Sequence, residues 1–420
     1  EEMRTYVIYS RMIANLSTGQ ESVILEDAPD DDVAYLVEHK TEFPGFDVDF
    51  GGWKREYPYG ETLSDVIGRV STSTDGLPAE SKDYYLSKGY QLNSPVGISG
   101  LEYEDNDILA GTEEISKITY DSNGLAVKET VQNARKGNDI VISVNIDLQQ
   151  TMDDTVKNVL SANAGTRNRE NFKSLFMCMM DPNNGDVLAL SGYEIDLETR
   201  KMTYFASGNY VSLVNPGSCI KGATVYMGLS EGVVKPGETI MDEVMDINGE
   251  EFASFENHGP VDDVRALEVS SNVYMFHVAI RLGGDVYQKG QPLNIADVQG
   301  THKKMEQYYS MFGLGNKTNL DIPGEVSGYM GNVMLPGQLL NYSIGQLDMY
   351  TPMQLLQYVS VIATDGRMYQ PHFLEYAKEV GGDEIFDVYG KHLESTLPEQ
   401  NEAYLQRVRE GFRACVTSGN

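Results

Sequence analysis

The chain has 420 residues, enough for roughly two to four domains of about 100–200 residues each and for a large buried core. Its 63 acidic and 32 basic side chains give a formal net charge of −31, which repels phosphate backbones and argues against nucleic acid as a partner. A hydrophobic content of 41% and a charged content of 23% exclude wholesale disorder.

The sequence carries no signal for a membrane span, a metal or a cofactor. No run approaches the roughly 18 consecutive apolar residues of a span, and no cleavable signal peptide opens the chain. The cysteines and histidines lack ligand spacing, so we expect neither a metal nor a cofactor. We predict that Cys178, Cys219 and Cys415 are buried free thiols. A catalytic thiol at Cys219 is disfavoured because no histidine lies near it in sequence.

Residues 1–138 are polar, irregular and rich in turn signals such as Pro44-Gly45 and Ser94-Pro95. Short strands separated by such turns predict an elongated, β-rich pedestal domain with little core of its own. The acidic run Asp30-Asp31-Asp32 could bind a cation, but such runs are more often solvated loops, and we interpret it as one.

The character of the sequence changes at Asp139, where we place the start of a second domain, residues 139–420. Apolar side chains alternate with smaller or polar ones from Ile140 to Ile146, as in a half-buried strand. A helix is predicted over Gln149–Leu160, because apolar residues recur there at helical spacing and acidic residues come early.

Two apolar runs, Leu175–Met180 and Val187–Leu190, flank the turn Asp181–Gly185 and predict a hairpin that is apolar on both faces. Such strands belong at the centre of a sheet covered by helices, which predicts an α+β fold with a central antiparallel sheet. Later segments are mostly helical. Thr351-Pro352-Met353-Gln354 supplies a capping threonine, a proline in the first turn and a capping-box glutamine, and starts a helix that runs to about Asp365.

Ser218 and Lys221 form an S-x-x-K motif at the start of a predicted helix, where a spacing of three places both side chains on one face. A serine hydroxyl is a poor nucleophile without a neighbouring base, and a lysine serves as that base only when it is neutral. The positive end of a helix and partial burial both lower a lysine pKa. The Ser218 N–H at the same terminus could face a developing oxyanion.

Spacing alone does not establish this site. About one S-x-x-K is expected by chance in a chain of this length, and Ser218 could simply begin a helix. The S-x-N element Ser270-Ser271-Asn272 has the same weakness, since Ser207-Gly208-Asn209 and other segments match it too. On spacing alone, the structural interpretation of both motifs is favoured. The glycine-rich segment Gly313–Thr318 lacks the order of a phosphate loop, and we predict a turn there.

The order of the motifs is more informative than any one of them. From about Asp139 onward the chain resembles the transpeptidase domain of class B penicillin-binding proteins, bacterial enzymes that cross-link peptidoglycan. The matching segments follow in the family's order: Met180-Asp181-Pro182, Asn215–Lys221, His258-Gly259, Ser270–Val273, Phe312–Gly315, Asp321–Glu325, Ser343–Gln346, Thr351–Gln354 and Pro371-His372. The first 138 residues resemble the family's pedestal less specifically, through Arg55–Gly60, Ile67–Val70 and Gly100–Glu102.

The resemblance implies a role for each motif residue. Ser218 would attack the carbonyl of a D-alanyl-D-alanine stem peptide, and Lys221 would take its proton as the acyl-enzyme forms. Ser270 would pass a proton toward the leaving nitrogen, and Asn272 would orient the substrate amide. Peptidoglycan stem peptides and β-lactams are the implied ligands, and a membrane glycan polymerase is the implied protein partner. The resemblance also implies the outer face of the bacterial cell membrane, with an N-terminal anchor before Glu1.

One family element is not found. No Lys-Thr-Gly or Lys-Ser-Gly tripeptide occurs in these 420 residues, and Lys317-Thr318-Asn319 is the nearest string. We expect that the chain stops short of this element and that it acylates poorly alone. Two other functions stay open: a serine β-lactamase or β-lactam sensor, and a catalytically silent cell-wall scaffold.

Overall fold

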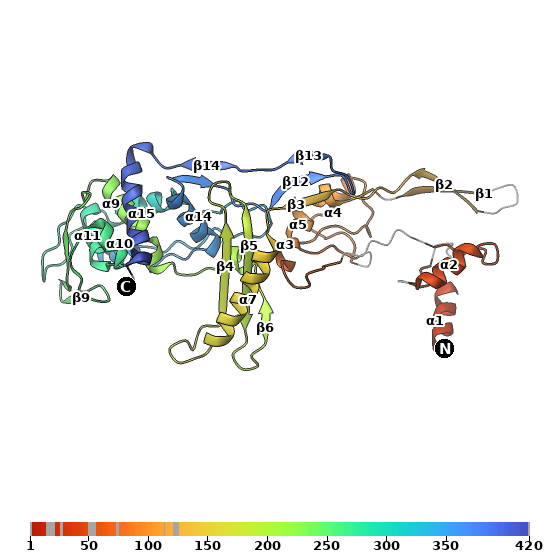
Figure 1. Ribbon diagram of the computed structural model, residues 1–420, viewed down its shortest axis with the longest axis horizontal. Helices are drawn as coiled ribbons and strands as arrows, with labels where there is room; N and C mark the ends of the chain where they lie inside the picture. The colour runs from red at the N-terminus through yellow and green to blue at the C-terminus, as the bar shows by residue number, and fades with distance from the viewer. Residues whose placement is uncertain are drawn as a thin grey trace. The chain divides into compact units, whose positions relative to one another are not determined.

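The computed structural model describes residues 2–13, 22–25, 28–48, 56–72, 75–112, 114–120 and 126–418. The chain divides into two compact units, Glu1–Glu56 and Tyr57–Asn420, which are described separately (Figure 1). Three residues of the segments singled out in the sequence, Arg55, Gly419 and Asn420, lie outside the described residues.

The first unit contains helices α1 (Glu2–Ile13) and α2 (Asp30–Glu38). The acidic run that we predicted to be a loop instead forms the first turn of α2. Its three carboxylates are solvent-exposed, and they sit where the free N–H groups of the helix favour negative charge. The prediction of a solvated run was therefore right about exposure and wrong about conformation.

Residues 57–138 of the second unit contain more helix than we predicted. Among the described residues they form four short helices and one hairpin: α3 (Ser64–Ile67), α4 (Lys82–Ser87), α5 (Gly100–Glu104), α6 (Asn106–Leu109), β1 (Ile115–Tyr120) and β2 (Ala126–Gln132). The turn signals thus mark breaks between single helical turns. Gly68 and Gly100, both with positive φ, let the backbones of α3 and α5 approach closely, since a Cβ on Gly68 would lie 1.8 Å from the Ser99 carbonyl oxygen.

The central sheet has the order β4-β5-β6, all antiparallel: β4 (Ser174–Met180), β5 (Val187–Ile195) and β6 (Met202–Tyr204). On one face, Ala189 and Tyr193 of β5 pack in a core with α7 (Ile146–Asn163). On the other face, Leu190 packs in a core with Met353 of α14 (Pro352–Ala363). The predicted apolar hairpin is therefore covered on both faces, and the α+β fold class is confirmed.

A second three-stranded sheet has the order β13-β12-β3 and joins β3 (Asp139–Ile142) to β12 (Leu374–Lys378) and β13 (Ile385–Val388). The pair β11 (Arg367–Tyr369) and β14 (Leu393–Thr396) lies next to α14. The predicted capping box of α14 is present: Gln354 Oε1 accepts the Thr351 N–H at 2.9 Å, and Thr351 Oγ1 accepts the Gln354 N–H at 3.2 Å.

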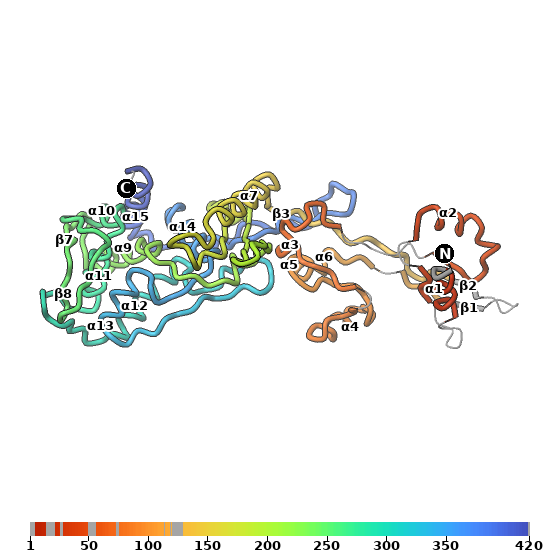
Figure 2. The backbone as a smooth tube through the Cα atoms, turned by 90° about the horizontal axis from the view of Figure 1, so that it is seen from below, coloured from red at the N-terminus to blue at the C-terminus, as the bar shows by residue number. Residues whose placement is uncertain are grey.

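Five helices surround α9 (Lys221–Ser230): α10 (Asp263–Glu268), α11 (Asn272–Leu282), α12 (Val298–Ser310), α13 (Pro336–Ser343) and α15 (Glu402–Thr417). Figure 2 shows them gathered at one end of the second unit. Every residue of α9 from Lys221 to Leu229 is buried, as in a helix packed on all sides. Short strands β7 (Ile240–Asp242), β8 (Met245–Ile247), β9 (Glu250–Phe252) and β10 (Gly259–Val261) flank this cluster. None of the helices in the described part of the chain is both long and apolar enough to cross a membrane.

Candidate active site

The S-x-x-K motif lies where a 3-10 turn, Gly217–Ile220, runs directly into α9. Gly217 has a φ of +54°, and its N–H donates to the Gly345 carbonyl at 3.0 Å, which fixes the entry of the chain into the turn. Ser218 is exposed, whereas Lys221 is only 1% exposed. The turn thus presents a serine to solvent and places a lysine in the core three residues later.

The Lys221 ammonium joins the two sequence motifs. Its Nζ donates to the Ser270 carbonyl at 2.6 Å, to Ser270 Oγ at 3.1 Å and to Asn272 Oδ1 at 2.6 Å. A lysine has three N–H donors, so these bonds use all of them. The structure therefore brings Lys221, Ser270 and Asn272 together although Lys221 and Ser270 are 49 residues apart in sequence. Between the described Ser218 and Lys221 side chains there is no hydrogen bond.

Burial lowers the pKa of Lys221 to about 8, and the negative charge of Asp242 opposes this shift. A pKa of about 8 leaves roughly one lysine in ten neutral at pH 7. A buried lysine in this state can accept a proton from a nearby hydroxyl, as a general base must.

Ser270 and Asn272 lie at the tight turn between α10 and α11. The Ser270 N–H donates to Leu267 and the Ser271 N–H to Ala266, and Ser270 takes a left-handed φ of +56°. This conformation costs about 1–2 kcal/mol in a non-glycine residue. Ser271 then caps α11 by accepting the Tyr274 N–H at 3.0 Å, so that Asn272 is the first residue of the helix.

Hydrogen bonds from α12, α13 and α14 hold α9 in place. Thr224 Oγ1 donates to the Ser343 carbonyl at 2.9 Å and is 2.7 Å from the Tyr309 hydroxyl. The Tyr358 hydroxyl accepts the Ala223 N–H at 3.3 Å, near the start of the helix. The lysine is thus carried on a helix whose backbone and side chains are both fixed.

Two residues that touch the S-x-N turn were missed by sequence reasoning, namely Asp242 and Ser254. Ser254 Oγ accepts the Asn272 N–H at 2.8 Å and donates to Asp242 Oδ2 at 2.7 Å. Neither residue belongs to a recognisable motif. The sequence around them offers no signal, because Asp242 is followed directly by another acidic residue, Glu243, in a segment without regular alternation.

The cysteines differ from the prediction. Cys178 is partly buried, and desolvation raises its pKa to about 12. Cys219 and Cys415 are exposed, so the prediction of buried thiols was wrong for these two. Cys219 is exposed because the 3-10 turn points it outward beside Ser218, and Cys415 lies in the last turns of α15. Gly313–Thr318 forms the predicted turn, with positive φ at Gly313 and Gly315.

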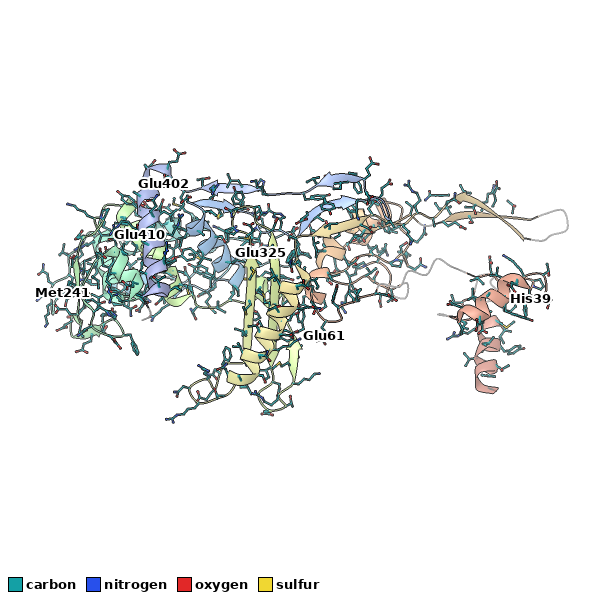
Figure 3. All side chains as sticks on the ribbon, in the orientation of Figure 1. His39, Glu61, Met241, Glu325, Glu402 and Glu410 are labelled. Carbon is teal, nitrogen blue, oxygen red and sulfur yellow. The ribbon has the colours of Figure 1, made fainter. Side chains whose placement is uncertain are left out.

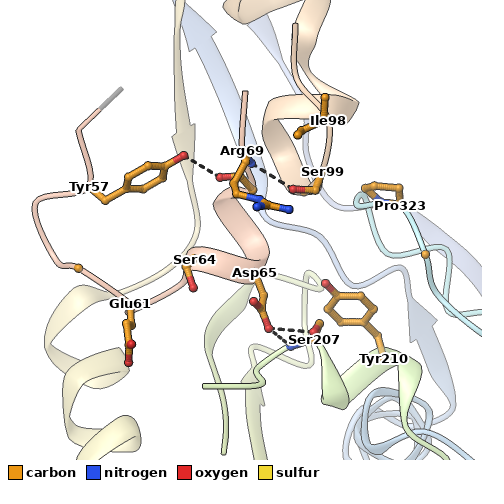
Figure 4. A pocket seen from close by; sticks show the side chains of 14 residues that line it. Tyr57, Glu61, Ser64, Asp65, Arg69, Ile98, Ser99, Ser207, Tyr210 and Pro323 are labelled. Atoms are coloured by element: carbon orange, nitrogen blue, oxygen red, sulfur yellow. Dashed lines mark hydrogen bonds between the residues drawn. The ribbon is translucent and has the colours of Figure 1, made fainter. Parts of the chain in front are cut away.

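A cavity of about 650 Å³ lies elsewhere in the second unit and contains none of the four motif residues (Figure 4). It is lined by residues of α3, of the Ile98–Gly100 segment and of the Ser207–Tyr210 segment. Asp65 accepts hydrogen bonds from the Ser207 N–H at 3.1 Å and from its hydroxyl at 2.8 Å. No group of three or more potential metal ligands occurs among the residues that the structure describes.

Comparison with known families matches two models to the chain. Residues 175–420 match the penicillin-binding protein transpeptidase domain, and residues 1–142 match the penicillin-binding protein dimerisation domain. The chain therefore belongs to the penicillin-binding proteins, and its two domains are those of the class B members, as the resemblance predicted.

Individual relatives agree with this assignment. Penicillin-binding protein 2A of Bacillus subtilis is 36% identical over 430 residues, which cover 100% of this chain and 59% of the relative. Peptidoglycan D,D-transpeptidase MrdA of Escherichia coli is 24% identical over 83% of this chain and 55% of the relative. The solved structure of penicillin-binding protein 2B from Streptococcus pneumoniae has a TM-score of 0.81 and 28% identity, covering 95% of this chain and 67% of that one. The chain thus spans less than two thirds of the length of these two curated relatives.

Proposed function

We propose that this protein is a peptidoglycan D,D-transpeptidase that works through a serine acyl-enzyme at Ser218. The observation that carries the proposal is the buried Lys221 ammonium, which lies within 3.1 Å of both Ser270 and Asn272. The name of the Escherichia coli relative, a peptidoglycan D,D-transpeptidase, supports the same reaction class.

In the proposed reaction, Ser218 Oγ attacks the carbonyl of the penultimate D-alanine while its proton passes to neutral Lys221. The bond between the two D-alanines then breaks. The leaving nitrogen takes up a proton that travels from Lys221 through the Ser270 hydroxyl, a route for which their 3.1 Å contact is short enough. Free D-alanine departs and leaves an ester on Ser218.

In the second half-reaction, the amine of another stem peptide attacks the ester and loses a proton to Lys221. Lys221 passes this proton to Ser218 Oγ as the ester bond breaks, so that Ser218 is regenerated and the new amide bond forms the cross-link. Asn272 would hydrogen-bond the substrate amide, although its Oδ1 accepts from Lys221 in the present arrangement. A β-lactam would follow the first step alone, because its opened ring stays attached to the serine.

We further propose that the protein acts on the outer face of the bacterial cell membrane, where peptidoglycan is built. Residues 1–138 would serve as the non-catalytic pedestal and residues 139–420 as the catalytic domain. A membrane glycan polymerase as partner stays a prediction.

The test is covalent labelling of the full-length protein with a fluorescent penicillin, followed by peptide mapping of the adduct. Ser218→Ala should abolish labelling, and Lys221→Ala should reduce it nearly as much, because residues that act as a unit lose activity together. Ser207→Ala is the matched control, since Ser207 begins another S-x-N segment and lies at the cavity rather than at the motif. An adduct that persists in Ser218→Ala would remove the assigned nucleophile. Rapid release of the adduct would indicate a β-lactamase, and no adduct in the wild type would indicate a scaffold.

A further inference from the structure

Asp242 is a buried carboxylate at the end of β7, next to the S-x-N turn. It is 1% exposed, whereas its neighbour Met241, labelled in Figure 3, is 52% exposed. The alternation of a strand therefore directs Met241 outward and Asp242 into the protein. Burying a carboxylate costs free energy unless hydrogen bonds compensate for the lost solvation. The groups that bond to Asp242 therefore indicate why it is buried here.

Two serine hydroxyls donate to the same oxygen of this carboxylate. Ser271 Oγ lies 2.5 Å and Ser254 Oγ 2.7 Å from Asp242 Oδ2. The other oxygen, Oδ1, is buried and has no hydrogen-bond partner among the described residues. Asp242 is thus bound through one carboxylate oxygen only. Both serines that bind this oxygen also contact the start of α11.

Each of these hydroxyls also accepts backbone N–H groups of α11. Ser271 Oγ accepts from Tyr274 at 3.0 Å, and Ser254 Oγ accepts from Asn272 at 2.8 Å and from Val273 at 3.3 Å. A helix start leaves four N–H groups without intrahelical partners, and three of them are satisfied here. Because a hydroxyl that donates its only proton to a carboxylate must face the helix with its lone pairs, Asp242 sets the orientation of both caps.

The orientation of this helix start decides where the S-x-N residues lie. Asn272 is the first residue of α11, and Ser270 precedes the capping serine. The Asn272 side chain donates to the Ala253 carbonyl at 3.1 Å, so it is tied to the segment that carries Ser254 while its oxygen meets Lys221. A change in the caps would therefore move the groups that contact Lys221.

We propose that Asp242 is a positioning residue of the active site, which acts through the hydroxyls of Ser254 and Ser271 to hold Ser270 and Asn272 against Lys221. This inference rests on the proposed transpeptidase function. Among the described residues, the hydrogen-bond partners of the Asp242 side chain are Ser254 and Ser271, and Ser218 is not one of them. Its role is to fix the turn that the lysine uses and to place a negative charge near the ammonium.

The electrostatic part of this role follows from the charges around α9. Burial lowers the Lys221 pKa, and Asp242 is the charged group that raises it. Two other carboxylates near α9 have a basic partner: Asp263 pairs with Arg407, and Glu231 pairs with Lys304. Removing the charge of Asp242 therefore lowers the Lys221 pKa further, because the ammonium loses its nearby anion.

Asp242→Asn separates charge from hydrogen bonding, because the amide oxygen can still accept from both serines. The measurement is the second-order rate of acylation by a penicillin in the full-length protein, followed across the pH range around the Lys221 pKa. Acylation needs neutral Lys221, so its rate rises with pH through that pKa. We expect Asp242→Asn to lower the plateau rate about tenfold, the size of one charge-assisted hydrogen bond, and to move the rising limb to lower pH. Asp242→Ala should lower the rate roughly a further tenfold.

Asp153→Asn is the matched control. Asp153 is also buried and accepts from a serine, Ser191, at 2.5 Å, but it lies on α7. This variant should lose thermal stability and keep the wild-type pH profile. If Asp242→Asn acylates at the wild-type rate with the wild-type pH dependence, Asp242 is not a positioning residue. The same conclusion follows if the variant loses only thermal stability, as the control does.

A second readout separates this inference from the proposed function. The Lys221 titration can be followed by NMR on protein labelled with 13C-lysine, with Lys221→Arg to assign the signal. Failure of the wild type to acylate would contradict the proposed function. The NMR titration would still decide the inference, because Asp242→Asn must move the Lys221 titration to lower pH. An unmoved titration would overturn it.

Discussion

Arg407 of α15 forms a bidentate ion pair with Asp263, the first residue of α10, through two N–H donors. Nε binds one carboxylate oxygen, and Nη2 binds the other at 2.7 Å. Asp263 is fully buried and also accepts the Gly237 N–H at 2.9 Å. Because α10 leads into the Ser270 turn, this ion pair anchors the helix from which the S-x-N motif emerges.

We expect Arg407→Ala to destabilise the protein by about 3–5 kcal/mol, because it leaves a buried carboxylate without its counter-charge. Urea denaturation measures the loss. Arg409→Ala is the control, since its partner Asp365 is 51% exposed and such surface pairs contribute at most about 1 kcal/mol. Equal losses in the two variants would contradict the assigned role of Asp263.

The pH dependence of acylation follows from Lys221. Its pKa of about 8 lies below the ordinary value of 10.5, so the neutral base appears as pH rises through 8. The acylation rate should therefore increase severalfold from about pH 7 to about pH 9. A rate that falls over this range would show that the ammonium, rather than the amine, is the active form.

The same shift links stability to pH. Between the folded pKa of about 8 and the unfolded value, the unfolded state binds the Lys221 proton and the folded state does not, so unfolding becomes less favourable as pH rises. As pH rises from about 8 to about 10.5, the free energy of unfolding of the wild type should increase relative to that of Lys221→Met. Denaturation curves at several pH values measure the difference, and a parallel response of both proteins would contradict it.

Gly68→Ala should disrupt the packing of α3 against α5 and destabilise the protein. The φ of +85° and the 1.8 Å approach to the Ser99 carbonyl leave no space for a methyl group, so we expect a loss of about 3 kcal/mol or more. Gly232→Ala separates the two causes, because Gly232 has a φ of +68° and nothing within 4 Å of its added Cβ. That control should lose only about 1 kcal/mol. Similar losses for both would mean that backbone strain, not crowding, matters at Gly68.

The cysteines should differ in reactivity. Exposed Cys219 should react with a thiol reagent in the folded protein, whereas Cys178, with its pKa raised to about 12, should react only after unfolding. Because Cys219 follows Ser218 directly, its modification should also block penicillin labelling. Mass mapping of the labelled peptides and a parallel labelling assay measure both effects. Cys219→Ala should lose the sensitivity to the reagent while keeping the labelling.

Local sequence patterns were sufficient to predict part of this structure. The Thr351 capping box and the two-faced apolar hairpin were predicted because neighbouring residues determine them. The short helices before β1 were missed, since helices of one turn have too few residues for periodicity to show. Their apolar residues are held by tertiary contacts instead.

For the site, the sequence could supply the types of the motif residues and, through their order, a family. It could not predict that Lys221 bonds both Ser270 and Asn272, because contacts over 49 residues depend on how α9 and α11 pack. The contact of Asp242 could not be predicted either, because its partner Ser271 in the S-x-N element is 29 residues away and Asp242 itself belongs to no motif.

The short helices that follow Tyr57 share their core with the central sheet. Leu63, Val66 and Leu101 are buried in the same cluster as Leu190 and Phe373. An engineered protein that begins at Asp139 would expose this cluster to water, aggregate readily and lose support beneath β5. A shortened protein that begins near Tyr57 keeps the cluster whole.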